Sequence, residues 1–271
     1  MASLCGKVII LTGAAGVIGS KTATYLAKFK PRLVLAGRNS TGLEHTYRAC
    51  KERGLKRDEL MPMETDLKRD CDLENLVSAT LKKFGQIDVL INNAGVAAFK
   101  TLCHTDISEF DYMMAINVRA PLLLTKICAP HLIASKGCVI NVSSVLGQIG
   151  MPHCLGYSMS KACLDHFSRT VAADLAQRGV RVNTISPGFM RTNIGLKQGI
   201  DRQNYEEYMA IQAAMTPLGR YAEARDIARM IAFLASDDAA FITGEIIRVD
   251  GGRGVSAPIL KTYEVFDEPG L

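Results

Sequence analysis

The chain has 271 residues, of which 48% are hydrophobic and 22% are charged, so it is able to bury a large core and contains no low-complexity or disordered block. The formal net charge of +5 comes from Lys and Arg residues that are dispersed rather than gathered into a basic stripe, which argues against nucleic-acid binding. Eight scattered cysteines without a C-x-x-C spacing favour reduced thiols in the cytoplasm, and no apolar run reaches the roughly 18 residues that a membrane span needs.

The opening segment MASLCGKVIILTGAAG places one Lys before an apolar run, as a signal peptide does. Thr12 and Gly13 cut the run short and lead into a glycine-rich loop. We therefore expect this run to be the first strand of the fold.

Short β-type runs then alternate with longer helical patterns along the chain. The runs KVIILTG, RLVLAG, LMPMETDL and IDVLINNAG precede helical patterns over about 18–30, 40–53, 70–84 and 106–134. The runs GCVINVSS, VRVNTISPG and EIIRVDGG continue the series, with helices over about 156–178 and 223–235 and an irregular stretch between them. This alternation predicts a single α/β domain over residues 1–271, built on a doubly wound parallel sheet of about seven strands. Ligands of such sheets bind outside the carboxyl ends of the strands.

A glycine-rich loop, TGAAGVIGS, follows the first predicted strand. Its glycines Gly13, Gly16 and Gly19 open a helix whose free amides and positive dipole end are suited to hold a pyrophosphate. A glycine triplet can also be an ordinary turn between a strand and a helix. Its position directly after the first strand favours the nucleotide interpretation.

The second strand ends in LAGRN. An acidic residue at this point would accept the ribose hydroxyls of NAD(H), but Gly37 leaves space there and Arg38 brings a cation that is able to pair with a 2′-phosphate. The sequence therefore favours NADP(H), although Arg38 could equally be a solvated surface residue.

The segment YSMSK places Tyr157 and Lys161 on one face of a helix, four residues apart. An adjacent ammonium favours the phenolate, so we expect Lys161 to lower the pKa of Tyr157 toward the working range of an acid-base catalyst. The alternative is a packed Tyr beside an exposed Lys.

Taken together, these motifs resemble the short-chain dehydrogenase/reductase family, in its classical branch of carbonyl reductases and 3-oxoacyl reductases. The resemblance covers nearly the whole chain and rests on TGAAGVIG, Asp66, the NNAG segment at 92–95, Asn117, Ser144, YSMSK, SPGFMRT and ITGEIIRVDGG. It implies a Rossmann-type fold and direct hydride transfer between nicotinamide and a carbonyl or secondary alcohol, with no metal. Val17 departs from the pattern, because it occupies the place of the middle glycine of the classical loop and leaves less room beside a phosphate.

The resemblance also implies roles for four catalytic residues. Tyr157 would transfer the proton, and Lys161 would hold the nicotinamide ribose. Ser144 would donate a hydrogen bond to the substrate oxygen, whereas its neighbour Ser143 is expected to face the other way. Asn117 would hold a water that links Lys161 to solvent, or it could be a local backbone partner.

The cofactor is expected to lie against a set of residues at the strand ends. Asp66 would bind the adenine and Asn93 the adenosine half, although a helix cap and a turn would explain these two residues as well. The full set is Gly13, Gly16, Ile18, Gly19, Arg38, Asn39, Asp66, Leu67, Asn93, Ala94, Gly95, Tyr157, Lys161, Pro187, Gly188 and Thr192.

A substrate lid is expected at about 190–216, where the regular alternation stops. Its apolar residues favour a bulky hydrophobic carbonyl substrate such as a steroid, acyl or xenobiotic ketone, although such residues can also be ordinary core. They are Met190, Ile194, Leu196, Ile200, Tyr205, Tyr208, Met209, Ile211 and Met215, joined by Met151 and Met159, with His153 and Cys154 as further candidates for the pocket wall.

Two expectations concern partners and function class. Two predicted helices carry more apolar surface than one sheet face needs, which predicts a homodimer or homotetramer. They contain the segments MMAINVRAPLLLTKICAPHLIA and CLDHFSRTVAADLA. The alternative to an enzyme is a catalytically idle dinucleotide-binding sensor or scaffold, since fold alone does not fix function. Intact Asn117, Ser144, Tyr157 and Lys161 argue against that alternative.

Overall fold

A computed structural model describes residues 4–191 and 201–255 of the chain. Its described strands form one parallel sheet of seven, in the order β3-β2-β1-β4-β5-β6-β7. The strands are β1 (Val8–Thr12), β2 (Arg32–Gly37), β3 (Leu60–Glu64), β4 (Val89–Asn92), β5 (Cys138–Val142), β6 (Arg181–Pro187) and β7 (Ile246–Val249). The prediction of a doubly wound parallel sheet is confirmed.

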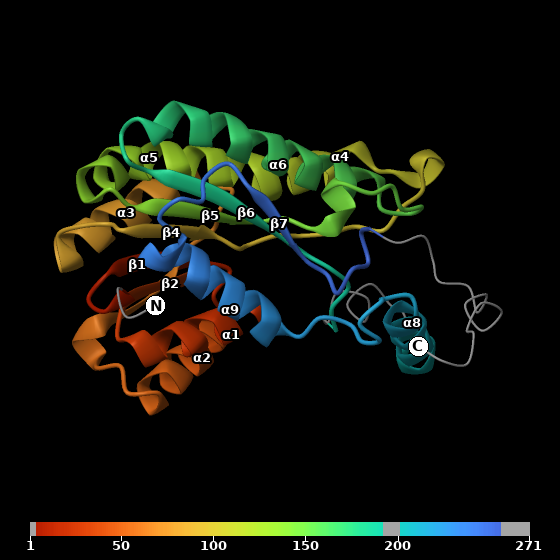
Figure 1. Ribbon diagram of the computed structural model, residues 1–271, viewed down its shortest axis with the longest axis horizontal. Helices are drawn as coiled ribbons and strands as arrows, with labels where there is room; N and C mark the ends of the chain where they lie inside the picture. Colours follow the sequence, from red (N-terminus) through yellow and green to blue (C-terminus); the bar gives the residue numbers. More distant parts are fainter. Residues whose placement is uncertain (1–3, 192–200, 256–271) are drawn as a thin grey trace, which may run out of the picture.

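The helices lie in two layers, one on each face of the sheet (Figure 1). The α-helices are α1 (Val17–Leu26), α2 (Ser40–Glu52), α3 (Asp70–Phe84), α4 (Ile107–Met114), α5 (Ala120–Ser135), α6 (Leu155–Ala176), α8 (Arg202–Ala214) and α9 (Ala224–Ala235). Short 3₁₀ turns are η2 (Ala27–Phe29), η3 (Arg57–Glu59), η4 (Leu102–His104), η6 (Val145–Gly147) and η7 (Asp237–Ala239). Helices α1, α2 and α9 cover one face, α3, α5 and α6 cover the other, and α8 stands apart from both layers.

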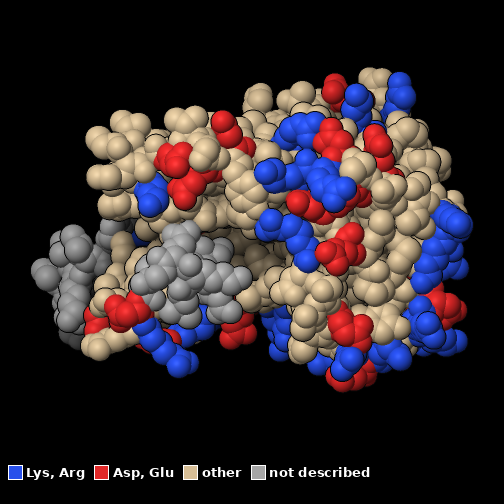
Figure 2. Space-filling model, turned by 180° about the vertical axis from the view of Figure 1, so that it is seen from behind, with Lys and Arg blue, Asp and Glu red and all other residues tan. Residues whose placement is uncertain are grey.

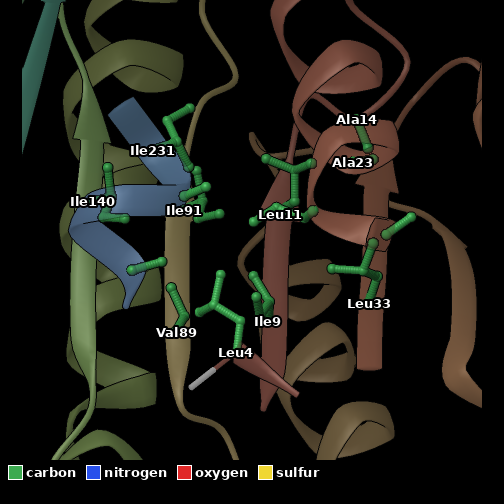
Figure 3. Close-up of a cluster of buried hydrophobic side chains, with 14 of the residues drawn as sticks. Leu4, Ile9, Leu11, Ala14, Ala23, Leu33, Val89, Ile91, Ile140 and Ile231 are labelled. Carbon is green, nitrogen blue, oxygen red and sulfur yellow. The ribbon is translucent and has the colours of Figure 1, made fainter. Parts of the chain in front are cut away.

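Both faces of the central strands are buried, which explains why these strands are continuous apolar runs rather than alternating ones. Ile9 and Leu11 of β1 point into the layer of α1 and α9, and Ile10 points into the opposite layer. Figure 3 shows the first of these cores, in which Leu11, Ile91 and Ile140 project from neighbouring strands near Ile231 of α9. Each such side chain stabilises the fold by about 1.5–3 kcal/mol through burial.

Two differences from the predicted elements lie in the helices. The pattern over 106–134 is interrupted by a π-helical turn, η5 (Ala115–Arg119), between α4 and α5. The stretch expected to be irregular contains α8. Neither difference changes the sheet, because both lie in connections between strands.

The strand order reverses between β1 and β4, since the chain runs outward from β1 to β3 and then returns to the other side of β1. Leu11 pairs with Ile91, so the loops that follow β1 and β4 begin side by side. A crevice at this position, outside the carboxyl ends of the strands, is where sheets of this kind bind ligands.

Candidate active site

Among the described residues, two cavities at the carboxyl edge of the sheet collect most of the predicted site residues. The glycine cavity, of about 390 Å³, is lined by Gly13, Ala15, Gly16, Val17, Ile18, Gly19, Ala36, Gly37, Arg38, Thr65, Leu67, Asn93, Ala94, Gly95, Val96 and Ile116. The apolar cavity, of about 380 Å³, is lined by Ile18, Ala97, Phe99, Ser143, Ser144, Val145, Leu146, Met151, Pro152, His153, Cys154, Tyr157, Pro187, Gly188, Phe189, Met190, Tyr205, Tyr208 and Met209. Ile18 belongs to both linings, so the two cavities adjoin at the start of α1.

The glycine loop has the close approaches that require glycine. Gly13 has a φ of +65°, and a Cβ atom on it would lie 2.8 Å from the Cα of Ala94. A Cβ atom on Gly19 would lie 2.1 Å from the carbonyl oxygen of Gly13. Gly16 is the N-cap residue of α1, so the helix begins at the cavity wall. Val17 is 47% exposed and lines the same cavity.

Asn93 ties the loop after β4 to the loop after β1. Its Nδ2 donates to the carbonyl oxygen of Thr12 at 2.8 Å, and the Thr12 hydroxyl accepts from the amides of Asn93 and Ala94 at 3.0 and 3.1 Å. The Oδ1 atom of Asn93 is buried without a hydrogen-bond partner among the described residues. An orphaned acceptor in the wall of a glycine-lined cavity fits a ligand with hydroxyl or amino donors, as a dinucleotide has.

At the ends of β2 and β3, only some of the residues expected to bind the cofactor line the glycine cavity. A Cβ atom on Gly37 would meet nothing nearer than 3.6 Å, and Arg38 lines the cavity beside it. Asp66 and Asn39 do not line the cavity. The Asp66 carboxylate accepts from the amide of Lys68 at 3.1 Å, and the Asn39 side chain caps α2 by accepting from Gly42 at 3.0 Å. Asn39 is therefore the N-cap of α2, whereas Asp66 makes a local turn contact and is not the helix cap that was its alternative, because the N-cap of α3 is Arg69.

The predicted catalytic residues come from α6, from the end of β5 and from η5. Tyr157 and Ser144 line the apolar cavity. The Nζ atom of Lys161 donates to the carbonyl oxygen of Val142 at 2.9 Å and lies 5.7 Å from the centre of the Tyr157 ring. A Cβ atom on Gly95 would lie 3.4 Å from this Nζ, so Lys161 lies directly behind a residue of the glycine cavity, although it lines neither cavity itself.

Asn117 and Ser143 have other partners. The Asn117 side chain accepts from the amide of Val96 at 2.9 Å and donates to its carbonyl oxygen at 2.8 Å, so the π-helical turn is joined to the loop after β4. The Ser143 hydroxyl donates to the carbonyl oxygen of Lys161 at 3.3 Å. Ser143 therefore holds α6 against β5. It was expected to face away from the site, but it also lines the apolar cavity together with Ser144.

The expectation that Lys161 lowers the pKa of Tyr157 is wrong for this arrangement. Burial raises the pKa of Tyr157 to about 12, and only the neighbouring Ser144 hydroxyl acts in the opposite direction. Burial also lowers the pKa of Lys161 to about 8. The charge of Asp165 raises this pKa, but by less than burial lowers it. Loss of hydration dominates because both side chains are enclosed and the ammonium is hydrogen-bonded to Val142 rather than to the phenol.

The apolar cavity contains part of the predicted wall and several residues that sequence reasoning missed. Seven expected residues line it: Met151, His153, Cys154, Met190, Tyr205, Tyr208 and Met209. Met159, Ile211 and Met215 do not line it, and Ile194, Leu196, Ile200, Thr192 and part of the expected lid lie outside the described residues. Phe99 and Phe189 were missed. Phe189 lies inside the quoted SPGFMRT motif, so its position was available as a signal, whereas nothing local marks Phe99.

Comparison with known proteins shows the family of this chain. A family model described as enoyl-(acyl carrier protein) reductase matches residues 13–253. The chain belongs to the short-chain dehydrogenase/reductase family. It is 36% identical to an oxidoreductase of Methylorubrum extorquens over 93% of this chain and 99% of that one, and 34% identical to cis-4-hydroxycyclohexanecarboxylate dehydrogenase of Sinomonas cyclohexanicum over 91% and 96%. A cofactor-bound short-chain dehydrogenase/reductase from Caenorhabditis elegans superposes with a TM-score of 0.89 at 33% identity, covering 94% of this chain and 97% of that one.

As a short-chain dehydrogenase/reductase, the protein is an NAD(P)-dependent oxidoreductase that acts on CH–OH and C=O groups of small molecules. None of the comparisons favours the idle sensor or scaffold. Within residues 4–191 and 201–255, no helix combines the length and apolarity that crossing a bilayer requires. On the face seen in Figure 2, Lys and Arg are interspersed with Asp and Glu.

Proposed function

We propose that this short-chain dehydrogenase/reductase is an NADPH-dependent carbonyl reductase for bulky, uncharged, apolar ketones. The observation that carries the substrate class is the wall of the apolar cavity. Its described lining contains no Asp, Glu, Lys or Arg, whereas aromatic and Met side chains surround Tyr157 and Ser144. A charged substrate group would lose its hydration there without a partner, which costs several kcal/mol.

The preference for NADPH is supported by the other cavity. Its described lining contains Arg38 and no Asp or Glu, and Gly37 leaves the strand end open. A guanidinium at this position pairs with a phosphate monoester, and a missing carboxylate removes the repulsion that a 2′-phosphate would meet.

The proposed reaction assigns one task to each catalytic residue. The bound nicotinamide would supply the hydride, at the point where the two cavities adjoin. Ser144 would donate a hydrogen bond to the substrate oxygen, and Tyr157 would donate its proton to the same oxygen. Burial raises the pKa of Tyr157 to about 12, so the phenol has a proton to donate at neutral pH. Lys161 would hold the ribose from the glycine cavity, supported by its hydrogen bond to Val142.

The substrate wall includes α8. Tyr205, Tyr208 and Met209 project from this helix into the lining of the apolar cavity. Phe189 packs edge-on against Tyr208, with ring centres 6.4 Å apart. We propose that this aromatic wall selects for ring-shaped or otherwise bulky ketones.

The test is a panel of ketones of matched reactivity, assayed by the loss of NADPH absorbance and in parallel with NADH. Neutral cyclic and long-chain ketones should give a kcat/KM at least about 10-fold above those of sugars and keto acids, since one well-filled apolar pocket discriminates by roughly 1–3 kcal/mol. Turnover of sugars or keto acids alone would overturn the substrate class. A higher kcat/KM with NADH would overturn the cofactor preference and leave the substrate class standing.

We also propose that the protein is a homodimer or homotetramer. Apolar side chains are exposed on α4, α5 and the first turns of α6, including Ile107 at 68%, Leu122 at 46% and Met159 at 50%. Contact with a second copy would remove such side chains from water. A monomer by light scattering at micromolar concentration would contradict this proposal.

A further inference from the structure

Tyr112 contacts two cations, of which Arg38 lines the glycine cavity. Arg38 follows β2, Lys68 follows β3, and Tyr112 lies in α4. The Nη1 atom of Arg38 donates to the Tyr112 hydroxyl at 2.9 Å. The Nζ atom of Lys68 lies 5.3 Å from the centre of the same ring. Three segments far apart in the sequence therefore meet at Tyr112.

Neither cation is neutralised by a carboxylate in the described part of the chain. The ion pairs there use Arg48, Arg69, Arg119, Arg191 and Arg220, and neither Arg38 nor Lys68 forms one. The nearby Asp66 carboxylate accepts from the backbone amide of Lys68 rather than from its ammonium. Two like charges held on one ring repel each other, and an anion bound between them would remove that repulsion.

The neighbouring cavity has room for such an anion. Arg38, Thr65 and Leu67 all line it, and no Asp or Glu does so among the described residues. Gly37, directly before Arg38, leaves open the space that a side chain would fill at the end of β2. A phosphate monoester suits two cations better than a carboxylate does, because it carries up to two charges and three acceptor oxygens.

We propose that Lys68 and Tyr112 complete, together with Arg38, a binding site for the 2′-phosphate of the cofactor. This inference rests on the proposed NADPH preference. Arg38 provides the planar donor pair and Lys68 the second positive charge. Tyr112 is a positioning residue, since its hydroxyl orients Arg38 and its ring face attracts Lys68.

Calorimetric titration with NADP⁺ and with NAD⁺ tests the site without turnover. The variants are Lys68→Gln and Tyr112→Phe. Lys51→Gln is the matched control, because Lys51 also lies over a tyrosine ring, 5.8 Å from the centre of Tyr47. Lys51 and Tyr47 line neither cavity. Lys68→Gln should raise the Kd for NADP⁺ about 10-fold, and Tyr112→Phe, which keeps the ring, should raise it about 3-fold. The Kd for NAD⁺ should change less than about 2-fold in both variants, and thermal melting verifies that each is folded.

The outcomes separate this inference from the proposal on which it rests. If Lys68→Gln leaves the Kd for NADP⁺ unchanged, or raises both Kd values equally, the second cation of the site is wrong. If the Kd for NADP⁺ rises with Arg38→Gln alone, the NADPH preference stands and only the roles of Lys68 and Tyr112 fall. If the wild-type protein binds NAD⁺ at least as tightly as NADP⁺, the cofactor preference itself is wrong and this site falls with it.

Discussion

The ammonium of Lys161 lies 5.7 Å from the centre of the Tyr157 ring, but its hydrogen bond goes to the carbonyl oxygen of Val142 at 2.9 Å. Lys161 is therefore fixed to the end of β5 and not to the phenol beside it. It is only 3% exposed, so a positive charge is kept in an enclosed place where it costs stability.

That cost gives the first prediction, for the protein without cofactor. Burial lowers the pKa of Lys161 from 10.5 to about 8, which corresponds to about 3 kcal/mol at most. Below pH 8 the ammonium is charged in both the native and the unfolded state, so the full cost is present. Between about pH 8 and 10.5 the unfolded state binds the extra proton, and the free energy of unfolding rises with pH.

Lys161→Met should therefore raise the free energy of unfolding at pH 7, and this gain should shrink as pH increases from 8 to 10.5. Urea melts at pH 7 and pH 9.5 measure both values. Lys51→Met, on the exposed face of α2, is the control for the loss of a lysine that is not buried. A gain for Lys161→Met that stays constant with pH would show that desolvation of the charge is not the cause.

The second prediction concerns Asp165, a buried carboxylate one turn beyond Lys161 on α6 that was not among the predicted site residues. It is 3% exposed and faces Lys161 and Arg169 from its own helix, and Ser143 and Gln148 from the segment after β5. Neither of its oxygens has a hydrogen bond of normal geometry among the described residues. Its charge raises the pKa of Lys161.

Asp165→Asn removes this charge at nearly constant volume, so Lys161 should lose its proton at lower pH. The alkaline limb of the pH profile of kcat/KM for ketone reduction should move toward neutrality, while Asp165→Glu should keep it near the wild-type position. An unchanged limb in Asp165→Asn would mean that Asp165 does not act through Lys161.

The third prediction concerns an ion pair behind the substrate wall. Arg191, just after β6, donates to Glu206 of α8 at 2.6 Å and to the Tyr221 hydroxyl at 3.2 Å. Both ion-pair side chains are about half exposed, so the pair contributes roughly 0–1 kcal/mol to stability. Because the pair joins the segment after β6 to α8, which carries Tyr205, we expect it to position α8 against the cavity.

Glu206→Gln should raise the KM for an apolar ketone several-fold, while kcat, the Kd for NADP⁺ and the melting temperature stay close to wild type. Glu207→Gln, at the next residue, is the control, because Glu207 accepts from Gln203 within α8 and forms no ion pair among the described residues. Equal KM values in the two variants would contradict a role for Arg191 and Glu206 in positioning α8.

The strands of the sheet could be predicted from the sequence, because their apolar runs are local in the chain. The apolar runs around Leu11 and Ile91 are buried on both faces, and for that reason they were readable as strands of a parallel sheet. The π-helical turn at Asn117 was not readable, because the partner of Asn117 is Val96 in the loop after β4, 21 positions away in the sequence. The contact of Lys68 with Tyr112 could not be predicted either, because the two residues are 44 positions apart in the sequence.

The direction of the pKa change at Tyr157 could not be predicted from the sequence either. The spacing of Tyr157 and Lys161 was sufficient to place both on one face of α6, but it carries no information about burial. Enclosure by the apolar cavity, with residues such as Phe189 from a distant segment, decides the direction of the pKa change. A motif identifies which groups meet, and the surrounding packing determines how they titrate.

Turnover and cofactor binding of Tyr157→Phe, measured side by side, test whether the phenol transfers the proton. Tyr208→Phe is the matched control, because it removes a second phenol from the same apolar cavity. With an apolar ketone at pH 7, Tyr157→Phe should lose at least about 100-fold in kcat and keep the wild-type Kd for NADP⁺, whereas Tyr208→Phe should keep most of its turnover. Near-normal turnover in Tyr157→Phe would contradict the proton-transfer role on which the proposed reaction depends.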